Sequence, residues 1–167
     1  RDRSPSRGLG DVYKRQDREH QLRRVLEPLK ERFDYIFVDC PPSLELLTLN
    51  GLCAADGILV PVQCEYYALE GLSDLMATLR AVKRRVNQAL DIDGVVLTMY
   101  DGRTNFSAQV AQEVRRHFPG KVFRTMVPRN VRLAEAPSHG LPVGAYDRFS
   151  RGAVAYGDLA DEIVEKG

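Results

Sequence analysis

A carboxylate at the end of an apolar run is the first feature of this 167-residue sequence that could do chemistry. Residues 35–39 read Tyr-Ile-Phe-Val-Asp, and Pro41 and Pro42 follow after one cysteine. β-Branched and aromatic residues in such a run predict a strand buried on both faces, and the prolines end it because they lack an N–H. Ligands of open α/β sheets bind beyond the carboxyl ends of the strands, so Asp39 is expected near a metal ion or a phosphate. The simpler alternative is a strand-end Asp that caps the helix expected to begin near Ser43.

A basic segment is the second feature that points to a ligand. The whole chain has a formal net charge of +1, but residues 103–151 contain nine Lys or Arg and only three Asp or Glu. A basic segment within an otherwise acidic body is a candidate polyanion surface, and solvated helix faces are the simpler alternative.

Other kinds of site have little support in the composition. The three cysteines lack CxxC spacing, which indicates neither a disulfide framework nor a zinc site. The three histidines are scattered, and His139 is interpreted as a local structural residue. No apolar run approaches the roughly 18 residues of a transmembrane helix and no signal-peptide pattern is visible, so a cytoplasmic protein is expected.

The pattern of apolar residues predicts the elements that must position these groups. Helices are expected at residues 17–32, 43–55, 69–89 and 106–118 and from Ser150 onward, and strands at 35–39, 57–62, 93–99 and 122–127, with a further short strand at 143–146. Alternation of strands and helices predicts a three-layer α/β/α domain with a mostly parallel sheet. In the terminal helix, the inward-facing residues are expected to be Val154, Leu159, Ile163 and Val164.

The chain is expected to contain one domain behind a leader. Residues 1–16 are rich in Arg, Ser and Gly and lack apolar periodicity, so they are interpreted as a disordered leader that is foreign to the domain. Residues 17–167 contain no linker and no internal repeat, and they are expected to form a single, partial domain.

Four blocks of sequence resemble one family, the ParA/Soj chromosome-partitioning ATPases. Residues 34–43 (DYIFVDCPPS) are similar to the Walker B and switch II segment of that family. Three further blocks resemble it in the same order, at residues 65–71 (EYYALEG), 98–105 (TMYDGRTN) and 128–140 (PRNVRLAEAPSHG). The resemblance runs from about residue 33 to the C-terminus, and four ordered blocks are far more specific than one.

The resemblance implies a P-loop NTPase-like fold of the SIMIBI/ParA type, truncated at its N-terminus. Neither a GxxxxGK[ST] pattern nor a relaxed version of it occurs in the 167 residues, and the family's switch I Asp is absent as well. Phosphoryl transfer depends on the positioning and charge neutralisation that these groups supply. The chain by itself is therefore expected to be unable to hydrolyse ATP.

For the nucleotide side, the resemblance implies ATP and Mg²⁺ as cofactors of the intact parent protein. Asp39 matches the catalytic Walker B carboxylate, which would hold Mg²⁺ through a water molecule. Pro41 and Pro42 would belong to switch II, near the γ-phosphate. The expected contacts on the adenine side are Pro128, Arg129 and Asn130.

For partners, the resemblance implies an ATP-bound homodimer, non-specific DNA and a ParB-like protein that stimulates hydrolysis, in a cytoplasmic, nucleoid-associated setting. Arg103 and Arg132 match DNA-binding positions of Soj-like members, and Arg151 could join that surface. Guanidinium groups suit this role because they pair with phosphates without reading bases.

Three alternatives remain open. A membrane-associated relative such as the MinD division ATPases would need a basic amphipathic end, but residues 158–167 are acidic. A methyltransferase is faintly suggested by the Asp and the prolines of residues 39–42, although Cys40 separates them. The third alternative is a non-catalytic module that only contacts DNA or a partner.

Overall fold

Strands and helices alternate along most of the chain, as the sequence pattern predicts. The computed structural model describes residues 18–41, 45–65 and 68–166. The chain divides into two compact units, the first made of residues up to 57 together with 77–91, and the second of residues 58–76 and 92–167. Helix α4 contributes residues to both.

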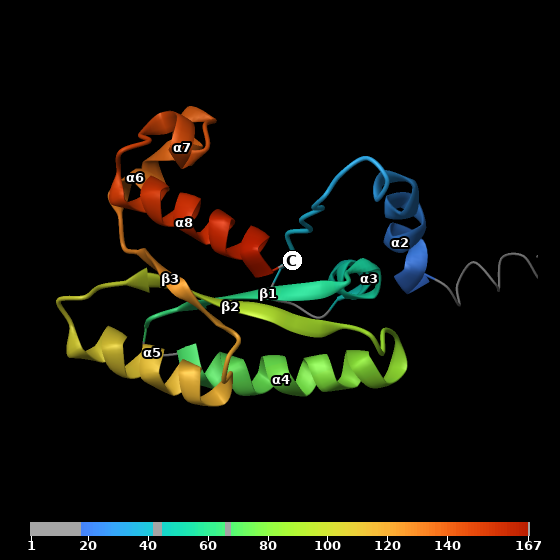
Figure 1. Cartoon of the computed structure of the whole chain (residues 1–167). Coiled ribbons are helices and arrows are strands. Elements are labelled where there is room, and N and C mark those ends of the chain that lie inside the picture. Colours follow the sequence, from blue (N-terminus) through green and yellow to red (C-terminus); the bar gives the residue numbers. More distant parts are fainter. Residues whose placement is uncertain (1–17, 42–44, 66–67, 167) are drawn as a thin grey trace, which may run out of the picture. The chain divides into compact units, whose positions relative to one another are not determined.

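The second unit contains the sheet (Figure 1). Along the chain its elements are β1 (Gly57–Gln63), α4 (Ala68–Arg85), β2 (Asp91–Tyr100), α5 (Asn105–His117), β3 (Val122–Pro128), α6 (Val131–Glu135), the 3₁₀ helix η3 (Ala136–His139), α7 (Val143–Tyr146) and α8 (Arg151–Lys166). The strand order is β1-β2-β3, and β2 pairs in parallel with β3. The strands expected at 57–62, 93–99 and 122–127 are confirmed.

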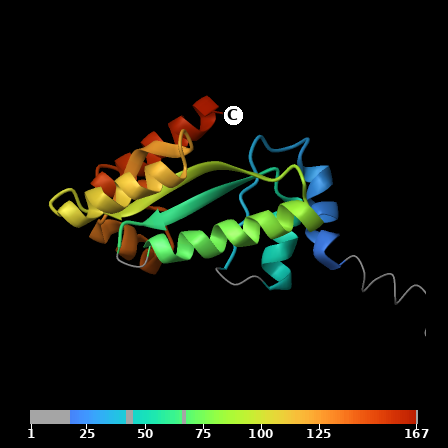
Figure 2. The same cartoon turned by 90° about the horizontal axis from the view of Figure 1, so that it is seen from below.

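Helices cover both faces of this sheet. Helix α8 lies on one face and α5 on the other, and Figure 2, turned to look onto the α5 side, shows α5 in front of the strands. Val96 and Leu159 belong to the cluster between the sheet and α8, while Val95 and Leu97 are completely buried. Because side chains alternate along a strand, Val95 and Leu97 point to the α5 side. The second unit therefore has the three expected layers.

A close approach inside the sheet explains one glycine. A Cβ built on Gly94 of β2 would lie 2.0 Å from the Phe123 ring of β3, so only glycine leaves room for that ring. Phe123 is the largest of the fully buried side chains, at 2% exposure. Gly94 and Phe123 thus form a matched pair in the core.

Helix α8 begins where the sequence predicts, but it buries a different set of side chains. Ser150 caps it, because the Ala153 N–H donates to the Ser150 hydroxyl oxygen at 3.2 Å. The expectation that Val154 and Val164 face inward is wrong, since they are 50% and 63% exposed. At about 100° per residue, the face that buries Leu159 excludes them, and small or polar side chains fill the contact instead: Gly152, Ala153, Ala155 and Glu162.

Glu162 is the unexpected member of that buried face. Its carboxylate oxygens accept the backbone N–H groups of Arg124 at 2.8 Å and of Thr125 at 3.0 Å, both in β3. These two N–H groups therefore bond to a side chain of α8. Burial by itself would raise the pKa of Glu162, but the N–H groups of Arg124 and Thr125, the Thr125 side chain and the Arg124 charge lower it on balance. Glu162 thus satisfies two donors of a strand at the end of the sheet order.

The short strand expected at residues 143–146 is a helix, α7. The Asp147 N–H donates to the Val143 carbonyl at 2.8 Å, which is the i to i+4 bond of an α-helical turn. Gly144 and Ala145 have little preference for strands, and four residues are too few for their apolar pattern to decide the outcome.

Helices are the regular elements of residues 18–54 in the first unit, among the residues described. This part contains the 3₁₀ helix η1 (Arg18–His20), α2 (Gln21–Leu26), a second 3₁₀ helix η2 (Glu27–Leu29) and α3 (Leu46–Ala54). The helix expected at 17–32 is therefore segmented, and Pro28 within η2 is one cause, since it lacks an N–H. The proposed cap at Ser43 and residue 17 lie outside the described residues.

Two buried asparagines stabilise this unit, and the sequence pattern gives no sign of them. The Asn50 amide donates to the Arg18 carbonyl at 2.8 Å, and its oxygen accepts the Leu22 N–H at 3.1 Å. The Asn87 amide donates to the carbonyls of Leu52 and Ala55 at the end of α3, at 3.0 and 2.9 Å. Both side chains thus satisfy backbone groups at helix ends.

The strand expected at residues 35–39 is absent. Residues 35–40 form no regular element, and the Phe37 side chain is 69% exposed. Tyr35 and Phe37 stack on each other with ring centroids 6.3 Å apart, as i and i+2 residues of an extended chain can. A strand requires a hydrogen-bonded neighbour as well as a suitable sequence, and among the described residues only β1, β2 and β3 pair with one another.

Candidate functional site

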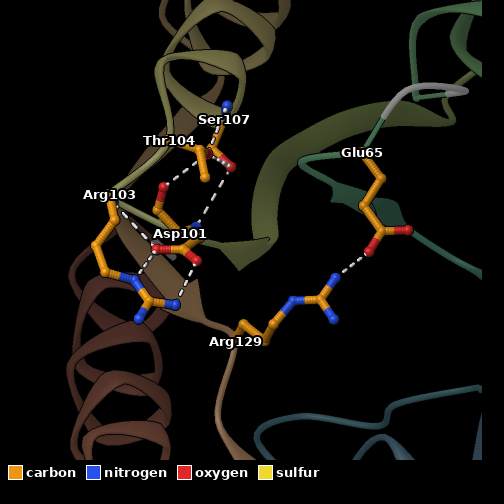
Figure 3. A network of polar contacts seen from close by, with 6 residues as sticks. All are labelled: Glu65, Asp101, Arg103, Thr104, Ser107 and Arg129. Carbon is orange, nitrogen blue, oxygen red and sulfur yellow. Dashed lines mark hydrogen bonds and ion pairs between the residues drawn. The ribbon is translucent and has the colours of Figure 1, made fainter.

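The ends of the strands in the second unit bring several polar side chains together (Figure 3). Glu65 follows β1, Asp101 and Arg103 follow β2, and Arg129 follows β3. The Arg129 N–H donates to the Tyr100 carbonyl at 3.1 Å, which ties the last two loops together. In a parallel sheet the carboxyl ends of the strands meet at one edge, and ligands of such folds bind there.

Asp101 and Arg103 form a two-pronged ion pair. Arg103 donates from Nε to Oδ1 at 2.9 Å and from Nη2 to Oδ2 at 2.8 Å, and its backbone N–H also donates to Oδ1 at 3.1 Å. These bonds hold the pKa of the Asp101 carboxyl well below its usual range. The carboxylate is therefore charged throughout the physiological pH range.

The loop that holds Asp101 is fixed by the start of α5. Thr104 is the N-cap of that helix, and its hydroxyl donates to the Asp101 carbonyl at 3.0 Å and lies 3.0 Å from the Ser107 hydroxyl, which can donate to it in turn. The Asp101 N–H in turn donates to the Ser107 oxygen at 3.4 Å. The backbone around Asp101 is thus pinned at several points.

Met99 gives the end of β2 an unusual backbone. Its φ of 54° lies in the left-handed region, which non-glycine residues rarely occupy. The pairing register between β2 and β3 shifts between Leu97 and Tyr100, so the strand is irregular around Met99. A strained backbone of this kind persists only where surrounding contacts hold it. Here the irregular backbone at Met99 changes the direction of the chain two residues before Asp101.

Arg129, expected on the nucleotide side, is paired with an acid. Its guanidinium Nη2 donates to Glu65 Oε1, and Figure 3 shows it reaching toward Glu65 and away from Arg103. Both side chains are about half exposed. Pro128 ends β3, and the Asn130 oxygen accepts the Arg132 N–H at 2.8 Å as the N-cap of α6.

Arg132, expected on the DNA surface, is held by two acids. Its Nη1 lies 2.8 Å from Glu135 Oε2, and its Nε lies 3.3 Å from Asp147 Oδ2. Glu135 also accepts the Tyr146 hydroxyl at 3.3 Å, and the Arg132 hydrogen bond lowers the pKa of the Glu135 carboxyl. His139 stacks on Tyr146 at 4.8 Å, a contact that fits its predicted structural role.

Arg151 differs from Arg103 and Arg132. It is the first residue of α8 and its side chain is exposed. In the part of the chain that the structure describes, no ion pair involves Arg151, and a cation at a helix N-terminus is electrostatically unfavourable.

The expected catalytic carboxylate lies in the first unit. Asp39 is exposed in the irregular segment, and the neighbouring Pro41 carbonyl accepts the Thr48 hydroxyl at 3.4 Å. Pro42 lies outside the described residues. No three His, Cys, Asp or Glu side chains among the described residues gather as metal ligands.

Sequence reasoning identified the arginines but missed the acids that hold them. Glu65, Asp101 and Glu135 all lie inside blocks that resemble the family, yet none was given a role. Local spacing is a usable signal for two of them, since Asp101 is two residues before Arg103 and Glu135 is three after Arg132 on a helix. The Glu65–Arg129 pair joins residues far apart in sequence, and no local signal could reveal it.

No helix in the described ranges combines the length and apolarity that would let it cross a membrane.

The sequence is similar to that of known partitioning proteins. Residues 10–92 match the family described as AAA domain. The chain is 57% identical over 150 residues to the sporulation initiation inhibitor protein Soj of Bacillus subtilis, covering 90% of this chain and 59% of that protein. It is 50% identical over 156 residues to the chromosome partitioning protein ParA of Myxococcus xanthus, covering 93% of this chain and 55% of that protein. The chain thus spans somewhat more than half the length of these relatives.

Solved structures of related proteins share the fold. Cobyrinic acid a,c-diamide synthase from Mycobacterium smegmatis, with bound ATP analog and magnesium, superposes with a TM-score of 0.74 at 36% identity, covering 91% of this chain and 56% of that one. The cell division ATPase MinD of Pyrococcus furiosus gives a TM-score of 0.71 at 26% identity, covering 89% and 59%.

Proposed function

Because this chain belongs to the ParA/Soj family and has the α/β fold of P-loop NTPases, we propose that it serves in DNA segregation as part of an ATP-driven, DNA-binding switch. The observation that carries this proposal is the identity to Soj over nine-tenths of the chain. A match of that length takes in all four sequence blocks.

On the nucleotide side, the proposed ligand is ATP with Mg²⁺. The structure of cobyrinic acid a,c-diamide synthase with bound ATP analog and magnesium supports this assignment. Asp39 offers a single exposed carboxylate, which fits an outer contact to Mg²⁺ through water, since this ion keeps several waters. Pro41 and Pro42 lie beside Asp39 in sequence and would approach the γ-phosphate. When bound, Mg²⁺ neutralises charge on the phosphates.

On the base side, the proposed contacts are Pro128, Arg129 and Asn130. The Asn130 oxygen is used in capping α6, so its amide nitrogen is the group that can face a base. Arg129 must leave or share Glu65 to contact a ligand. The phosphate-binding loop would have to come from outside these 167 residues, and we expect the chain alone not to hydrolyse ATP.

On the DNA side, Arg103, Arg132 and Arg151 form the proposed phosphate-binding set, called the arginine set below. They lie after β2, in α6 after β3, and at the start of α8. All three belong to the basic segment of residues 103–151. Contacts to phosphate neutralise charge and release counterions without reading bases, which suits non-specific binding.

The partners follow from the family. ATP binding would favour a homodimer, the dimer would bind DNA through the arginine set of both copies, and a ParB-like protein would stimulate hydrolysis to release it. Such a cycle places the protein in the cytoplasm on the nucleoid.

Charge reversal tests the DNA surface. Arg103→Glu and Arg132→Glu should weaken binding to a short duplex without a defined binding sequence, measured by fluorescence anisotropy across a salt series. Each lost phosphate contact should also reduce the slope of log K against log salt by about 0.9. Arg116→Glu in α5 is the matched control, because Arg116 pairs with Glu113 at 2.7 Å in a similar ion pair. Unchanged affinity and slope in Arg103→Glu and Arg132→Glu would refute the proposed surface.

The second candidate is a non-catalytic module that contacts only DNA or a partner. The absence of a GxxxxGK[ST] pattern from the 167 residues favours it for this chain. Calorimetry with Mg-ATP separates the two functions. Binding that is lost in Asp39→Ala would favour the switch, whereas DNA binding without any Mg-ATP binding would favour the module.

A further inference from the structure

Two arginines of the proposed DNA surface are already engaged by carboxylates of their own unit. Asp101 binds Arg103 through both prongs of its guanidinium, and Glu135 and Asp147 bind Arg132. The same arrangement recurs at Arg129, which Glu65 engages (Figure 3). The arginines are thus presented as closed ion pairs rather than as free cations.

The carboxylate of Asp101 uses the groups of Arg103 that a phosphate would use. Two parallel N–H···O bonds, from Nε and Nη2, are the geometry in which a guanidinium recognises a carboxylate or a phosphate. A DNA phosphate that approaches this edge of Arg103 therefore meets an oxygen pair already in place. It must displace Asp101 or accept a poorer contact.

The acid is the fixed member of the pair and the arginine the movable one. The Asp101 side chain is 22% exposed, whereas that of Arg103 is 87% exposed. The Asp101 backbone is pinned by Thr104 and Ser107, as described above. Exchange therefore means that the Arg103 guanidinium swings away while the Asp101 charge remains behind.

We propose that Asp101 and Glu135 act as built-in competitors for DNA phosphates at Arg103 and Arg132. Each acid weakens binding, both by occupying its arginine and by leaving a negative charge within a Debye length of the bound phosphate. This inference rests on the DNA-binding role proposed above and adds its regulation.

Arg151 has a different place in this scheme. Among the described residues no acid pairs with it, so it can contact phosphate without an exchange. Its removal should weaken DNA binding, but no neighbouring carboxylate should modulate that contact. In the arginine set, Arg151 can therefore bind phosphate directly, whereas Arg103 and Arg132 must first exchange their carboxylate partners.

The test neutralises each acid without changing its size. In the full chain, Asp101→Asn should tighten binding to the same short duplex by about two- to fivefold at low salt, the range expected for an exposed ion pair. Glu135→Gln should tighten binding less, because Asp147 still engages Arg132 at 3.3 Å. The slope of log K against log salt should steepen by up to about 0.9 for each arginine released. Retained thermal unfolding behaviour confirms that the variants are folded.

Glu113→Gln is the matched control. Glu113 pairs with Arg116 at 2.7 Å, and its loss adds the same positive charge. It lies near the far end of α5, about 12 Å along the helix from Asn105. A general charge effect would tighten binding equally in Glu113→Gln, and that outcome would overturn the proposal.

A double-mutant cycle isolates the exchange itself. In an Arg103→Ala background, Asp101→Asn should lose its tightening effect, because the competitor then has nothing to compete for. If Arg103→Ala weakens binding but Asp101→Asn does not strengthen it, the competitor idea fails and the DNA surface survives. If the arginine variants bind like the unmodified chain, the proposed DNA surface fails. If neither the unmodified chain nor the acid variants bind DNA at low salt, both fail.

Discussion

Two apolar segments of this chain have similar sequences, but only one of them forms a strand. Residues 35–41 and β3 (Val122–Pro128) each contain aromatic and β-branched residues and end at a proline. In β3 the Phe123 side chain is 2% exposed, whereas Phe37 in the first segment is 69% exposed. Local pattern therefore does not decide which of the two becomes a strand.

The difference lies in what surrounds each segment. β3 pairs with β2, its ring at Phe123 fits over Gly94, and Glu162 of α8 accepts two of its N–H groups. Among the described residues, no strand pairs with residues 35–40. Backbone N–H and C=O groups require partners when buried, so a segment without a neighbouring strand remains exposed and irregular.

The largest expected effect is the loss of the Phe123 ring, compared with the loss of the Phe37 ring. Phe123→Ala should lower the free energy of unfolding by about 3–5 kcal/mol, because it removes a fully buried ring and leaves a cavity. Phe37→Ala should change it by less than about 0.5 kcal/mol, as expected of an exposed side chain. Denaturant unfolding of both variants measures this, and equal losses would mean that the segment is as well packed as β3.

The next effect concerns the helix that covers β3. A Cβ on Gly152 would lie 2.7 Å from the Leu133 side chain, so Gly152→Ala should destabilise by about 1–3 kcal/mol through overpacking. Gly157→Ala in the same helix meets nothing within 4 Å and should stabilise by about 0.5–1 kcal/mol. Opposite signs in thermal unfolding would confirm that α8 lies in close contact with Leu133 at Gly152 and has open space at Gly157, and equal signs would contradict it.

A substitution at Glu162 tests whether a side-chain carboxylate can replace the hydrogen-bond acceptors that a neighbouring strand would supply. Glu162→Ala should cost about 1–3 kcal/mol, because the N–H groups of Arg124 and Thr125 lose their acceptor. Unfolding by denaturant gives the value. A negligible loss would mean that water replaces the carboxylate without cost.

The same residue predicts a pH dependence. Its pKa is lowered in the folded state, so its contribution is complete above the ordinary value of 4.5 and is lost as the pH falls below it. Glu162→Gln should therefore show a smaller loss of stability on acidification than the unmodified chain. Parallel acid profiles of the two proteins would contradict this assignment.

The smallest chemical change that compares the two segments replaces one methyl group by a hydroxyl in each. Val38→Thr, at 41% exposure, should alter stability by less than about 0.5 kcal/mol. Val127→Thr in β3, at 2% exposure, buries a hydroxyl and should cost about 1–3 kcal/mol. Denaturant midpoints that shift equally would remove the distinction between the segments.

For the site, sequence reasoning found the cations but not their partners. Arg103 and Arg132 were named from matching positions in a family, and the acids beside them carried no such label. The pair of Glu65 and Arg129 depends on β1 and β3 lying in one sheet, which local spacing cannot express. The strain at Met99 is also invisible in the sequence, since nothing about methionine favours a positive φ.

The sequence by itself determined the order and type of most elements and the family, because the spacing of apolar residues and the four blocks are local properties. The helices at 46–54, 105–117 and 151–166 and the three strands follow from that spacing. Only the tertiary structure decided that residues 35–39 are not a strand, that α8 buries Glu162 rather than Val154, and that acids engage the arginines. Those outcomes depend on which groups that are distant in sequence come into contact in the folded chain. Burial and hydrogen bonding are set by these tertiary contacts and not by local sequence.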